Sequence, residues 1–235
     1  LPEIHPKRLQ LMVGRSDLQR DQGERPWPDL EIASGIEGAL ERHLAQGVPE
    51  EALRMLERRA DPGSREVLPL LTQAQIRARA LSAMDRAGEA QESLRGFSAE
   101  EVPLATAALR LAGGDLAGAE QALQLALAAR PKGVSEHALL GELQLAQGLA
   151  AMAQRTFAEV ATCDPDHAIA RLHLGHLFRG AGDFARAGIM LETAAHLAPQ
   201  LGAAVVGFAE LLSDSGNHAE AMGILDALLQ RRPET

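Results

Sequence analysis

The sequence has very little cysteine and few aromatic residues. Its 235 residues include one cysteine, one tryptophan, five phenylalanines and no tyrosine. A single thiol, Cys163, cannot form a disulfide within the chain. β-Sandwiches and β-barrels depend on aromatic and β-branched side chains, so their scarcity argues against both. Alanine, leucine, glutamine, glutamate and arginine are abundant instead, and these are good helix formers. The composition therefore predicts an all-α protein.

Basic residues and long apolar runs are also scarce. The net charge is −9, and the only lysines are Lys7 and Lys132. An acidic chain lacks the basic face that a nucleic-acid backbone requires, so we expect no nucleic-acid partner. No apolar run approaches the roughly 18 residues that cross a bilayer, so we expect no membrane span in this chain. The preference for arginine over lysine is typical of GC-rich bacterial genomes, and it leaves both a cytoplasmic and a periplasmic location open.

Familiar catalytic motifs are missing as well. The sequence has no glycine-rich nucleotide loop, no His-Glu-x-x-His, no Gly-x-Ser-x-Gly and no Cys-x-x-Cys. His167, His173 and His176 are the best candidates for a metal site, but a structural site needs four ligands and no fourth can be assigned. The glutamate pairs at 50–51 and 100–101 lie near predicted helix starts, where acidic groups favour the helix dipole. We expect no enzymatic activity, no catalytic residues, no cofactor and no metal.

What the sequence does have is an internal repeat of 34 residues. Three residue types recur at this step: Pro131, Pro165, Pro199 and Pro233; Gly114, Gly148, Gly182 and Gly216; Ala119, Ala153, Ala187 and Ala221. Apolar residues at helical spacing precede and follow each glycine. Gly182 can end one helix in the left-handed conformation, and Asp183 can cap the next. Pro199 cannot continue a helix interior. Each repeat is therefore predicted to be a pair of antiparallel helices.

The order of these residues resembles the tetratricopeptide repeat. That pattern runs Trp-x2-Leu-Gly-x2-Tyr, then Ala-x3-Phe, then Pro, over 34 residues. This sequence has Leu174-Gly175 with Phe178 after it, followed by Ala187 and Leu191, while the tryptophan and tyrosine of the pattern are replaced. The resemblance implies an all-α fold, a right-handed α-solenoid of antiparallel helix pairs with about six repeats.

The repeats divide the chain into frames. Four clear copies span 100–133, 134–167, 168–201 and 202–235, and an earlier copy fits 33–65. The frame 66–99 is degenerate, because it lacks a glycine near position 80 and has Gly88 and Gly96 instead. Residues 1–32 do not follow the period. We expect them to be a non-repeat lead-in that covers the first repeat, because end repeats expose an apolar face.

The first helix of each repeat is expected to carry the binding surface. In the tetratricopeptide family these helices line the inner wall, and repeat positions 5, 9 and 12 share one face. The predicted groove residues are Leu104, Ala108, Leu111, Ala138, Glu142, Leu145, Leu172, His176, Arg179, Val206 and Glu210, and the first repeat has Glu37, Glu41 and Leu44 there. The best-known members hold a C-terminal carboxylate with Lys, Asn and Arg at these positions, whereas this sequence has mainly Leu, Ala, Glu and His there. An apolar or mildly basic helix or extended segment is the expected ligand. Some of these leucines are alternatively expected to pack between repeats.

Two classes of function follow from the resemblance. The first is a protein–protein interaction scaffold or adaptor, for example in the assembly of a bacterial envelope or secretion complex. The alternative is the recognition or regulatory arm of a larger multidomain enzyme, similar to glycosyltransferases or sulfotransferases, of which this chain is a truncated part. RNA binding by related 35-residue repeats is disfavoured by the acidic charge and the constant step of 34. The last helix, 218–230, is apolar and has no capping element after it, which predicts either a homodimer or a continuation through that end.

Overall fold

The computed structural model describes residues 35–59 and 69–231. The predicted lead-in, 1–32, lies outside these residues. The described part of the chain contains twelve α-helices and no strand, which confirms the all-α prediction. Within that part, no helix combines the length and the apolar character needed to cross a bilayer.

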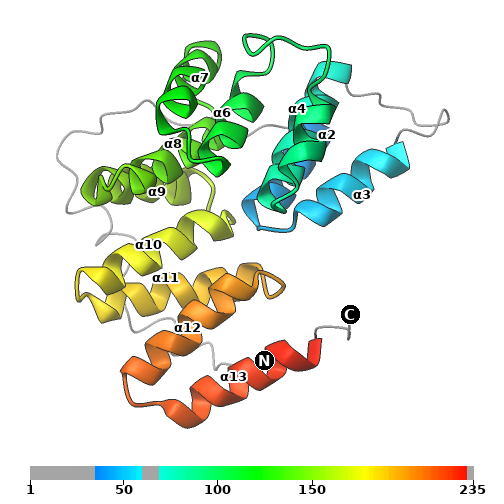
Figure 1. The fold of residues 1–235 in the computed structure, drawn as a ribbon. Helices are drawn as coiled ribbons and strands as arrows, with labels where there is room; N and C mark the ends of the chain where they lie inside the picture. The colour runs from blue at the N-terminus through cyan, green and yellow to red at the C-terminus, as the bar shows by residue number, and fades with distance from the viewer. Residues whose placement is uncertain (1–34, 60–68, 232–235) are drawn as a thin grey trace.

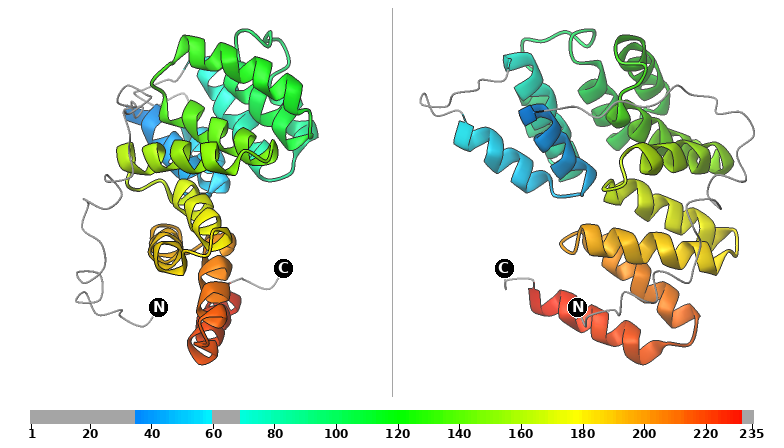
Figure 2. Two further views of the ribbon diagram at one scale, coloured as in Figure 1. Left: turned by 90° about the vertical axis from the view of Figure 1, so that its left-hand side faces the viewer. Right: turned by 180° about the vertical axis from the view of Figure 1, so that it is seen from behind.

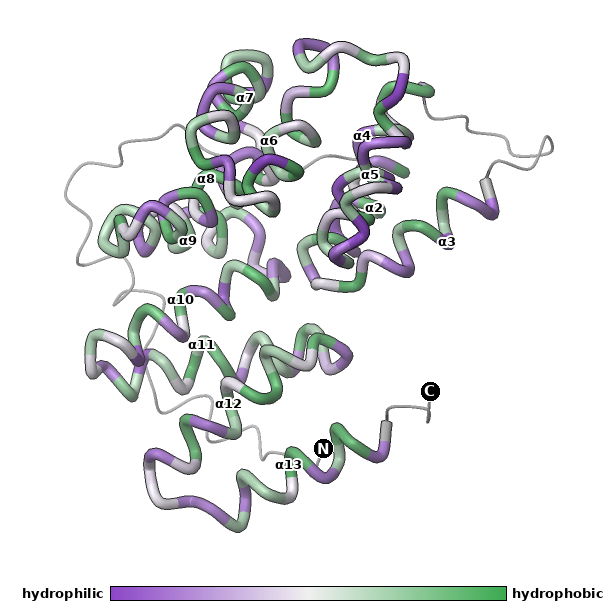
Figure 3. The backbone as a smooth tube through the Cα atoms, in the orientation of Figure 1, coloured by the Kyte–Doolittle hydropathy of each residue, from purple (hydrophilic) through white to green (hydrophobic). Residues whose placement is uncertain are grey.

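The helices form six consecutive pairs. They are α2 (Gly35–Ala45) with α3 (Pro49–Arg59), α4 (Leu70–Ala83) with α5 (Ala87–Ser93), α6 (Pro103–Ala112) with α7 (Leu116–Ala129), α8 (Val134–Ala146) with α9 (Ala150–Cys163), α10 (Ala168–Gly180) with α11 (Phe184–Leu197), and α12 (Gly202–Asp214) with α13 (His218–Arg231). Figure 1 shows the pairs stacked in chain order as an α-solenoid, the predicted fold class. Along each helix, hydrophilic and hydrophobic residues are interspersed (Figure 3), as amphipathic helices require.

The turns inside the pairs have the predicted chemistry. Gly182 adopts φ +77°, and Gly114, Gly148 and Gly216 have equivalent positive φ values. The carboxylate of Asp183 then accepts a hydrogen bond from the backbone N–H of Arg186 at 3.0 Å, so it caps α11. The glycine prediction and the cap prediction are therefore confirmed.

The degenerate repeat keeps the same turn with a different residue. Between α4 and α5 the left-handed position belongs to Asp85, with φ +57°, the one described non-glycine residue with positive φ. Aspartate tolerates this conformation better than most residues, because its short side chain can hydrogen-bond locally. Gly88 lies inside α5, and Gly96 follows that helix with φ +97°. The pair therefore forms without a glycine in its turn.

Small residues allow the helices of each pair to approach closely. Ala153 and Ala187 are fully buried. Gly175 of α10 packs against Leu191 of α11, and Gly141 of α8 packs against the ring of Phe157 in the same way. These contacts belong to one hydrophobic core that extends from α8 to α13. The recurring small residues of the repeat thus set the spacing between paired helices.

The N-terminal half of the solenoid closes on itself. Arg130 forms an ion pair with Glu37 of α2 at 3.0 Å, and Ser135 donates a hydrogen bond to Glu41 of α2 at 2.7 Å. Helix α2 also contacts α10, four pairs further along the chain. The views in Figures 1 and 2 agree in placing α2 beside the start of α10, whereas α12 and α13 extend away from this ring. Closure turns part of the expected open groove into a partly enclosed space.

Candidate partner-binding groove

Three of the predicted groove residues pack into the hydrophobic core. Leu104 is 4% exposed and Leu172 is 7% exposed, and both contact other buried residues between helix pairs. Leu145 is half-buried against the same core as Leu172. These leucines therefore agree with the alternative expectation, in which some groove positions pack between repeats. They stabilise the stack and offer little surface to a ligand.

Four other predicted residues meet at one cavity. Ala108 and Leu111 of α6 and Ala138 and Glu142 of α8 line a space of about 230 Å³, which we call the central cavity. Glu41 and Leu44, from the same repeat positions of α2, complete this part of the wall. The remaining lining residues are Ala45, Arg79, Ser82, Ala83, Ala112, Leu139, Ser135, His167 and Ile169. The prediction from repeat positions 5, 9 and 12 missed these residues, because helix ends and the degenerate repeat supply most of them.

A buried ion pair occupies one side of the central cavity. Arg79 Nη1 of α4 lies 2.5 Å from Glu41 Oε1 of α2, and the two side chains are 14% and 11% exposed. Burial raises the pKa of Glu41, but the charge and hydrogen bonds of Arg79 and the bond from Ser135 outweigh burial and lower it. The same carboxylate raises the pKa of Arg79 against its own burial. Both groups are therefore charged at neutral pH, and they neutralise each other.

Glu142 has no such counter-ion. Burial raises its pKa to about 6, and the charge of Arg79 opposes this rise only in part. Among the residues that the structure describes, none donates a hydrogen bond to the Glu142 carboxylate or forms an ion pair with it. At pH 7 the group is mostly ionised. The central cavity therefore carries one uncompensated negative charge.

The three histidines have separate environments. His167 is 4% exposed, and its Nδ1 accepts the backbone N–H of Ala170 at 3.2 Å as the cap of α10; burial lowers its pKa to about 4. His173 stacks on Phe157 at 4.7 Å between ring centroids, and burial lowers its pKa to about 4 as well. His176 is exposed. Within residues 35–59 and 69–231, no three metal-ligating side chains converge.

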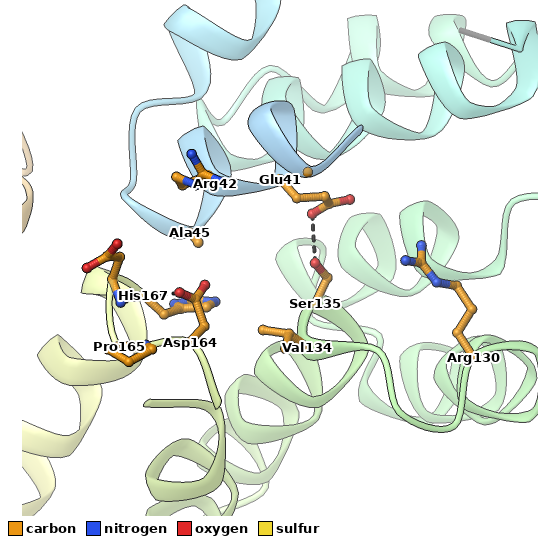
Figure 4. Close-up of a pocket in the computed structure, with 11 residues that line it drawn as sticks. Glu41, Arg42, Ala45, Arg130, Val134, Ser135, Asp164, Pro165 and His167 are labelled. Carbon is orange, nitrogen blue, oxygen red and sulfur yellow. Dashed lines mark hydrogen bonds between the residues drawn. The ribbon is translucent and has the colours of Figure 1, made fainter. Parts of the chain in front are cut away.

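A second space, the lateral cavity, adjoins the first. It has a volume of about 200 Å³ and includes Arg42, Arg130 and Asp164 in its wall. Both cavities share Glu41, Ala45, Ser135 and His167, so these four residues form the wall between them. Figure 4 shows Glu41 reaching from α2 to Ser135 at the start of α8, the hydrogen bond that closes this wall.

The last four predicted residues lie on α10 and α12. Arg179 bridges the two helices by pairing with Glu210 at 2.5 Å and Asp214 at 2.9 Å. Its pKa is raised, with the hydrogen bond to Glu210 as the largest cause. Val206 is 38% exposed and His176 lies exposed near it, against Gly207 of α12. These side chains form an open, accessible surface, which we call the open face.

The stacked pairs and the cavity between their first helices define a helical-repeat solenoid. Residues 178–235 match the family model of the tetratricopeptide repeat. The search of curated proteins finds no match.

Among solved structures, the chain is similar to many proteins at low identity, including the following three. MamA AMB-1 is 20% identical with a TM-score of 0.47, over 69% of this chain and 99% of that chain. MamA 41-end from Desulfovibrio magneticus RS-1 is 20% identical with a TM-score of 0.41, over 71% and 94%. The Naa15/Naa10 complex bound to HypK-THB is 21% identical with a TM-score of 0.43, over 85% of this chain and 32% of that chain.

Proposed function

We propose that this chain is a scaffold or adaptor that binds a peptide or helix of a partner protein along its first helices. One observation carries the proposal: residues that share repeat positions 5, 9 and 12 meet at the central cavity on α6 and α8 and remain accessible on α12. A ligand lying along these helices would place one side chain in the cavity and others on the open face. In the tetratricopeptide family, which the repeats resemble, the first helices line the wall that is used for recognition.

The charges of the surface favour an apolar or mildly basic ligand. The chain carries a net charge of −9, and Glu142 contributes an uncompensated charge inside the central cavity. On the open face, Glu210 and Asp214 are already paired with Arg179, which leaves Val206 and His176 for contact. An acidic partner would be repelled by Glu142 and by the net negative charge of the chain.

Site-specific photo-crosslinking in the organism that encodes the chain tests this proposal. A p-benzoylphenylalanine at Val206, on the open face, should capture a discrete partner protein. The same reagent at Leu125 is the matched control, because this residue of the second helix α7 is also exposed, at 48%. We expect the Leu125 position to capture no such product. Equal capture from both positions, or no capture from Val206, would contradict binding along the first helices.

The C-terminal end of the stack supports a further contact. On α13, Met222 is 64% exposed and Leu229 is 66% exposed. We propose that this face packs against another helix pair, from a second copy or from a longer chain. A photo-crosslinker at Met222 distinguishes a second copy from a longer chain by the mass of the crosslinked product, because a dimer of this chain has twice its mass of 25.0 kDa. Assembly of an envelope or secretion complex and recognition for a linked catalytic domain are both compatible with such a contact. A catalytic domain encoded in the complete gene would favour the second.

A further inference from the structure

We propose that the central cavity binds one basic side chain of the partner, a lysine or an arginine, with Glu142 as its counter-ion. The proposal rests on the proposed function for the source of that side chain, since a scaffold would receive it from a bound segment. The cavity itself can be tested without any partner. Its recognition chemistry follows from volume, wall composition and charge.

The cavity has the size and lining for an aliphatic stem. Leu44, Leu111 and Ala138 provide apolar walls from three different helices. A water molecule takes up about 30 Å³ in the liquid, so a cavity of about 230 Å³ has room for a chain of several heavy atoms. Lysine and arginine both bury their methylene stems against apolar surface while the charged end meets a polar group.

The charge balance selects a cation for the end of that stem. Glu142 is faced by Arg79 from α4, Glu41 from α2 and His167 at the start of α10. Arg79 and Glu41 neutralise each other, and His167 is held neutral by burial. Among the described residues, Glu142 is therefore the one charged cavity group without an ion pair or a hydrogen bond, and the charge of Arg79 compensates it only in part. Pairing it with a cation offsets the cost of keeping a carboxylate away from water.

Other ligand classes fit less well. A phosphate or carboxylate would be repelled by Glu142 and would compete with Glu41 for Arg79. A neutral apolar side chain would leave Glu142 desolvated and unpaired, which costs free energy. A metal ion would need several convergent ligands, and none of the described side chains form such a group. The carboxylate of Glu41 is engaged by Arg79, whereas that of Glu142 forms no ion pair with a described residue.

The test is a titration of the intact chain with n-butylammonium chloride, followed by two-dimensional ¹H–¹⁵N NMR at pH 7.5 and constant ionic strength. We expect saturable shifts in the backbone amide signals of Ala138 and Ile169, which line the cavity. Glu142→Gln should weaken binding about tenfold to a hundredfold, because it removes a charge-assisted contact. Glu120→Gln is the matched control, since this exposed carboxylate of the second helix α7 lies outside the cavity and should leave the affinity unchanged. n-Butanol should cause no saturable shifts.

Two further results decide the proposal if Glu142→Gln perturbs folding. In the unsubstituted chain, affinity for n-butylammonium should fall as the pH drops below about 6, where Glu142 becomes protonated. The overall amide spectrum reports folding in the same experiment. Non-saturable shifts, equal binding of n-butanol, or an affinity that is constant from pH 7.5 to pH 5 would each overturn the proposal. A partner captured by crosslinking with no cation binding would refute the cavity alone, and cation binding with no partner would refute the scaffold function.

Discussion

The close packing of Gly175 against Leu191 provides the sharpest test of how the repeats are held together. A Cβ atom added at Gly175 would lie 2.5 Å from Leu191 Cγ and 2.7 Å from Leu191 Cδ2. It would also lie 3.3 Å from the backbone nitrogen of Leu191. Leu191 is fully buried, so its side chain cannot turn outward into solvent. Gly175→Ala therefore forces α10 and α11 apart or forces Leu191 into a poor rotamer.

The magnitude follows from two opposing effects. Overpacking a core typically costs about 1–3 kcal/mol, whereas replacing a helical glycine by alanine gains about 1 kcal/mol. Gly180→Ala isolates the second effect, because Gly180 lies on the same helix and an added Cβ there meets nothing within 4 Å. We expect Gly180→Ala to be stabilised by up to about 1 kcal/mol and Gly175→Ala to be destabilised by up to about 2 kcal/mol.

Urea unfolding followed by far-ultraviolet circular dichroism measures this difference. A thermal scan should separate the two variants by about 2–4 °C for each kcal/mol. Because repeat arrays can open locally, amide hydrogen exchange at Leu191 should accompany both measurements. Exchange there should accelerate in Gly175→Ala and not in Gly180→Ala. If Gly175→Ala is as stable as Gly180→Ala, the close approach of α10 and α11 is not what this glycine provides.

Two other predictions concern charge. Arg79→Met should lower the free energy of unfolding in urea by about 3–5 kcal/mol, because it leaves the buried Glu41 without its counter-ion. Arg54→Met is the control in an exposed ion pair and should cost less than about 1 kcal/mol. Equal costs for the two variants would contradict a stabilising role of the buried pair. Burial lowers the pKa of His167 and His173 to about 4, so the unfolded chain binds more protons between pH 6.5 and pH 4. The free energy of unfolding should therefore be highest above pH 6.5 and fall by roughly 2 kcal/mol for each ring by pH 5. His167→Asn should make this fall smaller. If the free energy of unfolding of His167→Asn depends on pH as steeply as that of the unsubstituted chain, His167 is not a buried neutral ring.

The fold was predictable because its information is local and repeated. A glycine such as Gly182, an acidic cap such as Asp183 and a proline such as Pro199 each fix the backbone within a few residues, and their recurrence every 34 residues multiplies the signal. The turn at Asp85 shows the limit of this reasoning. There the backbone conformation is retained while the residue type changes, so a search for glycine finds a degenerate copy.

The binding surface was predictable only in part. Ala108 and Glu142 occupy the same position, 9, of two successive repeats, and both line the central cavity. The same rule could not separate them from Leu104, which is buried between pairs. Whether a position faces a cavity or a neighbouring helix depends on the rotation and tilt of each pair, and these vary along the stack.

By itself, the sequence determined that this chain folds into stacked helix pairs, because turn and cap residues act over short distances. Tertiary structure alone decided that α2 returns to α8 and α10, that Arg79 meets Glu41, and that Glu142 is left without a counter-ion. Residues such as Glu41 and Ser135 lie 94 positions apart, and the small rotation between successive pairs accumulates before it brings them together. No short sequence pattern specifies this accumulated rotation.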